Sequence, residues 1–311
     1  LFLVLVVADL FIFGIKYNNY LDYQSYFAPP QTVKFLQADK DTFRIWSVGW
    51  DKSWQEVYGL SRGWQNKLDL YYNYREIIPP SLNVFWGIDS IEERTMREGG
   101  SGGVEWYGQL QVPLLDSVKK ENSDKLAISD LVLKLEGMQN VKYLLSFEEL
   151  QNSNLELIKE ISTGFLSPVK IYRNSYFMPR AFGAFKYQTI NHREALSYIF
   201  KDDCKPNEEI ILEKNISYQG GTNGKAEVNM VSYQSEKIEI QINYNQPGLL
   251  FVSNVYYPGW QALIDGKESE IYRANYAFQA IKVPAGQHEI KFIYAPLSYR
   301  IGKIITLITL V

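Results

Sequence analysis

The sequence predicts an α+β fold, in which a mixed α/β region is followed by an antiparallel β-sandwich and truncated transmembrane helices flank both. Three observations lead to this fold class. Helix-like and strand-like segments are mixed in the first two thirds of the chain, whereas closely spaced alternating strands fill residues 207–297. Both ends are apolar runs.

The two ends have the composition of membrane-spanning helices. Residues 1–15 are apolar except for Asp9, and residues 301–311 are again mostly apolar. Each run is shorter than the about 20 residues that span a bilayer. We therefore expect residues 1–16 to be the end of one transmembrane helix and residues 298–311 the start of another. The alternative is that both ends are buried elements of a soluble core, because short apolar runs do not reveal their surroundings.

Residues 17–206 carry signals for both helices and strands, which predicts an α+β domain. Ser129 and Asn191 are typical N-cap residues, and each precedes an expected short helix. Four segments enriched in β-branched and aromatic residues are expected strands. They are Phe43–Val48, Val141–Leu145, Leu155–Ile161 and Val169–Arg173, the last two joined as a hairpin around Thr163-Gly164.

Residues 207–297 alternate apolar and polar side chains, which is typical of half-buried strands. The clearest case is residues 238–244, where isoleucine or tyrosine occupies every second position. Candidate strands follow one another closely between Glu209 and Tyr294, and turn residues such as Asp265-Gly266 separate them. This density of strands and turns predicts a β-sandwich.

The composition excludes several functional classes. A net charge of -3 and a sequence pI near 5.6 give no clustered basic surface, so we expect no nucleic-acid partner. Cys204 is the single cysteine, which excludes an internal disulfide. With only His192 and His288 beside it, the chain has too few ligands for a Cys/His zinc cluster, and we expect no metal site.

A series of short motifs carries a family resemblance. Its centre is Tyr256-Tyr257-Pro258-Gly259-Trp260, and further motifs follow at Ile264–Lys267, Ile271–Phe278, Val283–His288 and Phe292–Pro296. In order and spacing this resembles the C-terminal extracytoplasmic region of the bacterial YfhO family of membrane proteins. Weaker signatures lie upstream at Asn140–Leu145, Val169–Asn174 and Met178–Phe182.

That family looks like polyprenyl-phosphate-sugar-dependent glycosyltransferases of the multi-pass GT-C type, several of which glycosylate cell-envelope polymers. The resemblance implies the bacterial cytoplasmic membrane, a main domain on its extracytoplasmic side, bilayer contact through both ends, and a polyprenyl-phosphate-linked sugar donor for the parent protein. No cofactor is expected in this fragment. The family's catalytic carboxylate lies in an early extracytoplasmic loop, which we expect upstream of Leu1, so no catalytic residue is assigned.

The predicted role of this region is to cover the active site or to engage the acceptor. The candidate carbohydrate-binding residues are Tyr257 and Trp260 as an aromatic platform, with Arg273 and Asn275 as hydrogen-bonding groups. Alternatively, Pro258-Gly259 forms a tight turn and Trp260 packs in the core. The alternative function is a non-catalytic module of an envelope protein that binds glycan or protein.

Four further patterns match functional motifs weakly. Gly99, Ser101 and Gly103 fit a hydrolase nucleophile elbow, but a glycine-rich linker is the better interpretation. Asp39-Lys40-Asp41 fits a metal-binding D-x-D pair, yet a solvated turn is expected. Residues 220–225 resemble a phosphate loop without its first glycine and final hydroxyl, which favours a turn. Asp9 in an apolar run marks a functional site or faces the interface.

Overall fold

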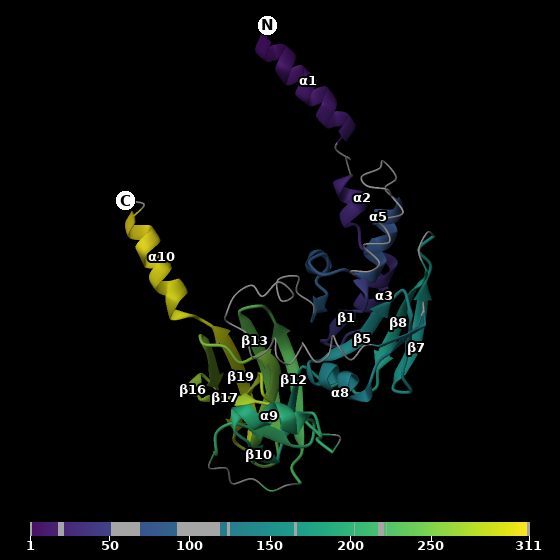
Figure 1. Cartoon of the computed structure of the whole chain (residues 1–311). Helices are drawn as coiled ribbons and strands as arrows, with labels where there is room; N and C mark the ends of the chain where they lie inside the picture. Colours follow the sequence, from purple (N-terminus) through teal and green to yellow (C-terminus); the bar gives the residue numbers. More distant parts are fainter. Residues whose placement is uncertain are drawn as a thin grey trace. The chain divides into compact units, whose positions relative to one another are not determined.

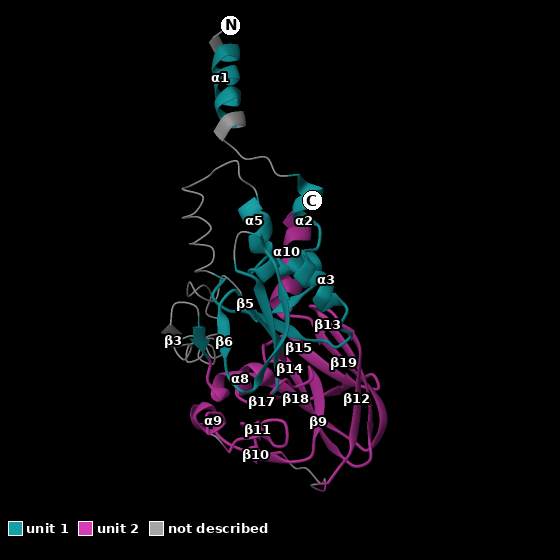
Figure 2. Cartoon of the chain, turned by 90° about the vertical axis from the view of Figure 1, so that its right-hand side faces the viewer, with its two compact units in different colours: residues 1–98, 120–127, 142–175 teal, residues 99–119, 128–141, 176–311 magenta. Residues whose placement is uncertain are grey.

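The computed structural model divides the chain into two compact units (Figures 1 and 2). Unit 1 comprises residues 1–98, 120–127 and 142–175, and unit 2 comprises residues 99–119, 128–141 and 176–311. The structure describes residues 2–17, 22–50, 69–91, 119–122, 125–164, 167–201, 203–216, 221 and 223–309. Residues 176–206 belong to unit 2, ahead of the predicted domain boundary at 206/207, which stays a prediction.

Unit 1 is built around a five-stranded sheet in the order β2-β1-β5-β8-β7. Its strands are β1 (Arg44–Ser47), β2 (Asp89–Ser90), β5 (Val141–Ser146), β7 (Leu155–Ile161) and β8 (Val169–Asn174). A small second sheet joins β3 (Lys119–Asn122), β4 (Lys125–Ala127) and β6 (Glu149–Gln151). The predicted hairpin is present, because β7 and β8 pair antiparallel.

Helices complete unit 1. They are α1 (Phe2–Tyr17), α2 (Tyr23–Phe27), α3 (Gln31–Gln37), α5 (Asp69–Tyr74), η1 (Arg75–Ile77) and η2 (Asn83–Trp86). Apolar side chains of α3, α5, η1 and η2 join those of the sheet in one core. Buried residues of that core include Val33, Leu36, Ile45, Ile77 and Ile171.

Unit 2 contains two larger sheets, in the orders β10-β11-β17-β18-β14-β9 and β12-β13-β19-β15-β16. The first comprises β9 (Ala181–Ala184), β10 (Tyr187–Thr189), β11 (Ile210–Leu212), β14 (Gly248–Val255), β17 (Ile271–Ala274) and β18 (Phe278–Val283). The second comprises β12 (Ala226–Tyr233), β13 (Lys237–Tyr244), β15 (Trp260–Ile264), β16 (Lys267–Ser269) and β19 (Gly286–Tyr294).

Side chains of both sheets meet in one hydrophobic core. Ile240 and Phe292 come from the second sheet, Leu250 and Ile281 come from the first, and all four are fully buried. The alternation predicted for residues 238–244 is confirmed, since the isoleucines and Tyr244 are buried while the intervening residues are more exposed. The α+β class is thus confirmed; the sandwich remains a prediction that this shared core favours.

The two predicted helix caps of unit 2 are confirmed. The hydroxyl of Ser129 accepts a hydrogen bond from the backbone amide of Val132, which begins α8 (Asp130–Met138). The side chain of Asn191 accepts one from the amide of Glu194, which begins α9 (His192–Ile199). Each cap satisfies an amide that has no partner within the helix.

Both apolar ends form exposed helices. Leu3 in α1 and Ile308 in α10 (Leu297–Thr309) are at least 70% exposed, and α10 extends from the end of β19 (Figure 1). Asp9 lies on α1 and is exposed. Within the described ranges, neither of these helices nor any other combines the length and the apolar character needed to cross a membrane.

Candidate functional site

Tyr257 lies on the turn between β14 and β15, Trp260 is the first residue of β15, and this turn is hydrogen-bonded to the residue after β19. Gly259 has a φ of +107°, and a Cβ there would lie 3.0 Å from the Cα of Pro296. The carbonyl of Gly259 accepts a hydrogen bond of 2.8 Å from the amide of Ala295. Glycine is therefore required at this position, because a side chain would meet both backbone strain and a neighbouring segment.

Three aromatic rings gather at this turn. The ring centroid of Tyr294 lies 5.3 Å from that of Trp260 and 6.5 Å from that of Tyr257. Trp260 is half-buried and packs against the core of unit 2, as the alternative interpretation expected. Tyr257 is 37% exposed. Trp260 therefore anchors the cluster, whereas Tyr257 presents a ring to solvent.

A cleft of about 260 Å³ opens beside these rings. Its volume lies just below the roughly 300–1,000 Å³ of pockets for drug-sized ligands, which suits a group the size of one ring. The lining combines aromatic faces with polar side chains, as carbohydrate sites do. Its residues are Tyr256, Tyr257, Pro258, Trp260, Gln261, Ala262, Glu268, Ser269, Ile271 and Gln279.

The structure does not bring Arg273 and Asn275 into the lining of this cleft. The guanidinium of Arg273 lies 5.0 Å from the ring centroid of Tyr256, so Arg273 contacts a residue of the lining without belonging to it. Asn275 is fully buried with a φ of +44°, and its side-chain oxygen accepts a hydrogen bond of 2.9 Å from the amide of Ile211. Asn275 therefore holds β11 against the end of β17.

Arg273 also belongs to a polar cluster that sequence reasoning did not find. Glu213 contacts both His192, whose Nδ1 lies 2.6 Å from Oε1, and Arg273, whose Nη1 lies 3.3 Å away. The ring of His192 stacks on Tyr276, with centroids 4.7 Å apart. The residues come from α9, from the segment after β11 and from β17, so no single motif in the sequence could reveal them.

A second, shallower groove of about 500 Å³ lies on the outward face of β12, β13 and β19. Register places two rows of polar side chains across these strands, because Asn243 pairs with both Glu227 and Gln287, and Gln241 pairs with both Asn229 and Glu289. In the sequence, the only sign of this groove is the set of polar residues that alternate with the buried ones, such as Gln241 and Asn243. Exposed carboxamides and carboxylates of this kind can bind hydroxyl groups.

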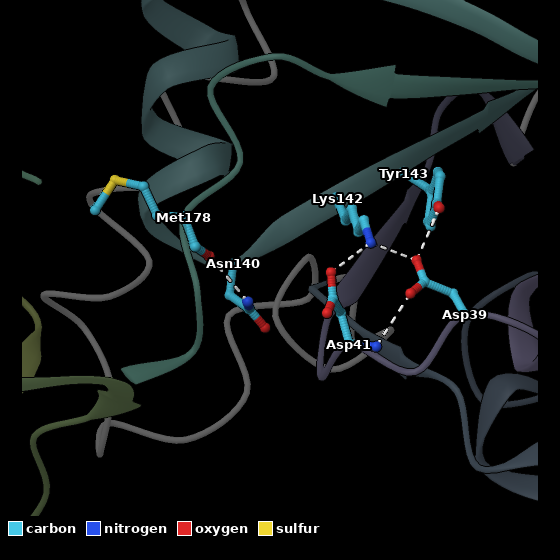
Figure 3. Close-up of polar contacts among 6 residues, drawn as sticks. All are labelled: Asp39, Asp41, Asn140, Lys142, Tyr143 and Met178. Atoms are coloured by element: carbon cyan, nitrogen blue, oxygen red, sulfur yellow. Dashed lines mark hydrogen bonds and ion pairs between the residues drawn. The ribbon is translucent and has the colours of Figure 1, made fainter. Parts of the chain in front are cut away.

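Both carboxylates of the D-x-D pattern in unit 1, those of Asp39 and Asp41, pair with one lysine (Figure 3). The ammonium of Lys142 forms ion pairs with Asp39 and with Asp41, at 2.7 Å in the second case, and the hydroxyl of Tyr143 donates to Asp39 at 2.8 Å. Burial raises the pKa of Asp39, but these hydrogen bonds outweigh it and hold the pKa below its usual 3.8. Both carboxylates of the pair are therefore engaged by the ammonium of Lys142.

The remaining sequence candidates lie wholly or partly outside the described residues. Gly99, Ser101 and Gly103 lie outside the described residues, as do Gly220 and Thr222 of the loop at 220–225. Cys204 is buried, and burial raises the pKa of its thiol to about 11, so it is a poor nucleophile. Across the described part of the chain, no three His, Cys, Asp or Glu side chains are grouped to hold a metal ion.

Unit 2 is thus a β-rich unit whose two sheets share one core and carry the aromatic cleft, and it ends in the exposed helix α10. Residues 213–306 match the family model described as "Bacterial membrane protein YfhO". The resemblance to the YfhO family that the sequence predicted is thereby confirmed for these residues. YfhO is a family of bacterial membrane proteins.

Similarity to individual proteins is narrower. The chain is 26% identical over 80 residues to "Uncharacterized protein YfhO" of Bacillus subtilis (strain 168). This match covers 26% of the chain but only 9% of the length of that relative. No solved structure matches the chain.

Proposed function

We propose that this chain is the extracytoplasmic region of a multi-pass membrane protein that acts as a polyprenyl-phosphate-sugar-dependent glycosyltransferase of the cell envelope, and that its aromatic cleft engages the acceptor glycan. The observation that carries the proposal is the position of the cleft. The turn that bears Tyr257 is bonded to Ala295, immediately before the apolar helix α10.

That position gives the cleft a role at a membrane surface. If α10 enters a bilayer, the rings of Tyr257, Trp260 and Tyr294 lie at the level of the lipid headgroups, where tyrosine and tryptophan are enriched. A lipid-linked sugar and a polymer at the membrane meet at the same level. The residues present bind and orient a glycan, and the transfer chemistry belongs to a part of the parent protein outside this chain.

Binding of the full chain in detergent to cell-envelope polymers and to polyprenyl-phosphate sugars tests the proposal. Tyr257→Ala is the decisive variant, because Trp260→Ala would also damage the core. We expect Tyr257→Ala to weaken binding about tenfold, or ~1.4 kcal/mol. Tyr23→Ala, at a 69% exposed tyrosine of unit 1, is the matched control and should bind as the wild type does. Equal affinities of the two variants would argue against the cleft.

The second candidate function is a non-catalytic glycan-binding or protein-binding module. The groove on β12, β13 and β19 favours it, because the rows of polar side chains are open to a long ligand. Asn243→Ala with Gln241→Ala should then abolish polymer binding, whereas Tyr257→Ala should not. Point variants are preferable to deleting residues 207–294, since β9 pairs with β14 and would lose its partner.

A further inference from the structure

Gln279 is one of the residues that line the aromatic cleft, and it is fully buried. It is the second residue of β18, in a strand whose other buried residues are apolar. A polar side chain in such a place costs free energy unless both ends of its amide are hydrogen-bonded.

The orientation of the Gln279 amide follows from one hydrogen bond. Its Nε2 donates to the carbonyl oxygen of Val255 at 2.8 Å. The register between β14 and β18 shifts between Val252 and Val255, and this irregularity brings the Val255 carbonyl within reach. Since a carbonyl oxygen only accepts, the NH₂ group must face Val255, and Oε1 is left on the other side.

Oε1 of Gln279 is buried, and among the described residues no group donates a hydrogen bond to it. A small donor that enters the cleft lined by Gln279 can satisfy it. A hydroxyl group has this size, whereas a peptide N–H is flanked by two α-carbons. The aromatic rings around the cleft suit the flat faces of a sugar ring.

We propose that Gln279 is a specificity-determining residue of the aromatic cleft, whose amide oxygen accepts a hydrogen bond from one hydroxyl of a bound pyranose. The inference rests on the proposed function, because Gln279 would recognise the ligand that the same cleft is proposed to bind. A site built to pair with a hydroxyl rejects an analogue that lacks it, since the buried acceptor is then left unpaired.

The test couples a protein change to a ligand change. Saturation-transfer NMR titrations of the full chain in detergent would measure the affinities of methyl glucoside, methyl galactoside and methyl N-acetylglucosaminide, and then of the monodeoxy analogues of the tightest binder. We expect one analogue to bind the wild type about tenfold more weakly than its parent. Gln279→Met, which keeps the side-chain length, should bind the parent and this analogue equally.

Two further arms keep the outcomes distinct. Gln279→Glu in its protonated form can donate to the carbonyl of Val255 and still offers an acceptor, so it should still discriminate between the parent and the analogue. The wild-type series needs no variant to fold, and affinities within twofold for all analogues would overturn the role of Gln279 even if Tyr257→Ala weakens binding. Tighter binding of N-acetylalanine methylamide, a minimal peptide, would overturn it as well. If no glycoside or polymer binds, the proposed function itself fails.

Discussion

Asn275 and Gln279 are both fully buried amides of unit 2, close together in the chain, but their surroundings differ. The amide oxygen of Asn275 accepts from Ile211, and its NH₂ group donates to the carbonyl of Pro206 at 3.4 Å. Gln279 has a partner for its NH₂ group, while its oxygen lacks one among the described residues. The amide of Asn275 joins β11 to the end of β17, whereas the amide of Gln279 belongs to the lining of the aromatic cleft.

This difference separates structural polar groups from groups that await a ligand. A buried amide with both ends paired stabilises the fold, whereas a buried acceptor without a donor lowers stability until something donates to it. Unit 1 offers a charged example of the first kind, since Lys142 is paired with both Asp39 and Asp41. Removing a fully paired buried group, such as Asn275 or Lys142, should therefore lower the free energy of unfolding. Removing Gln279 should change the free energy of unfolding little.

The largest effect is expected for Asn275→Ala. The change leaves the amide of Ile211 unpaired and places alanine at a φ of +44°, so we expect a loss of about 3 kcal/mol in the free energy of unfolding. Urea denaturation measures it. Asn275→Gly separates the two causes, because glycine tolerates the positive φ but lacks the amide. A loss below about 1 kcal/mol for Asn275→Ala would contradict the structural role of Asn275.

Lys142→Met should have the next largest effect, about 2 kcal/mol, because it leaves the largely buried carboxylate of Asp39 without its cation. Lys125→Met is the matched control, since the Lys125–Glu149 pair is 41% and 48% exposed and such pairs contribute about 0–1 kcal/mol. Thermal and urea denaturation of both variants give the comparison. Asp39→Asn added to Lys142→Met should recover part of the loss, and no recovery would contradict the pairing argument.

Gln279→Met should change the free energy of unfolding by less than about 1 kcal/mol. The variant loses the hydrogen bond to Val255 but also removes the buried oxygen that has no donor, and these two effects oppose each other. Denaturation in the absence of ligand measures the change. A loss as large as that of Asn275→Ala would mean that Gln279 is a structural amide like Asn275.

Local patterns predicted much of the fold. Alternation in residues 238–244 and the caps at Ser129 and Asn191 were read correctly because each depends on neighbours in the sequence. The pairing of Lys142 with Asp39 was missed, since the partners are far apart in the chain and nothing local links them.

The candidate site could be predicted only in part. The aromatic motif led to Tyr257 and Trp260, but the predicted site also included Asn275, whose positive φ and strand contacts appear only in the folded chain. Gln279 had a signal in the sequence, an uncharged polar residue in the mostly apolar strand Phe278–Val283, whose other polar residue is Lys282. That signal gains meaning only with the register shift that positions Val255.

The smallest effect concerns an exposed contrast to these buried amides, the His288–Asp265 pair at a turn of unit 2. Nδ1 of His288 lies 2.6 Å from Asp265, and Nε2 lies 3.2 Å from the carbonyl oxygen of Ala285. Both neighbours favour the doubly protonated ring. The hydrogen bond to Asp265 raises the pKa of His288 most, and the contact with Ala285 raises it further. Burial lowers it, but the net effect is a pKa above 6.5.

The sign of the pH dependence follows from that direction. Because the folded pKa is higher than the unfolded one, the stabilisation is complete below pH 6.5 and is lost as pH rises through the folded pKa. NMR titration of the His288 ring should show a midpoint above 6.5, and Asp265→Asn should lower it. A wild-type midpoint at or below 6.5 would show that the contact between His288 and Asp265, unlike the hydrogen bonds of Asn275, adds no stability.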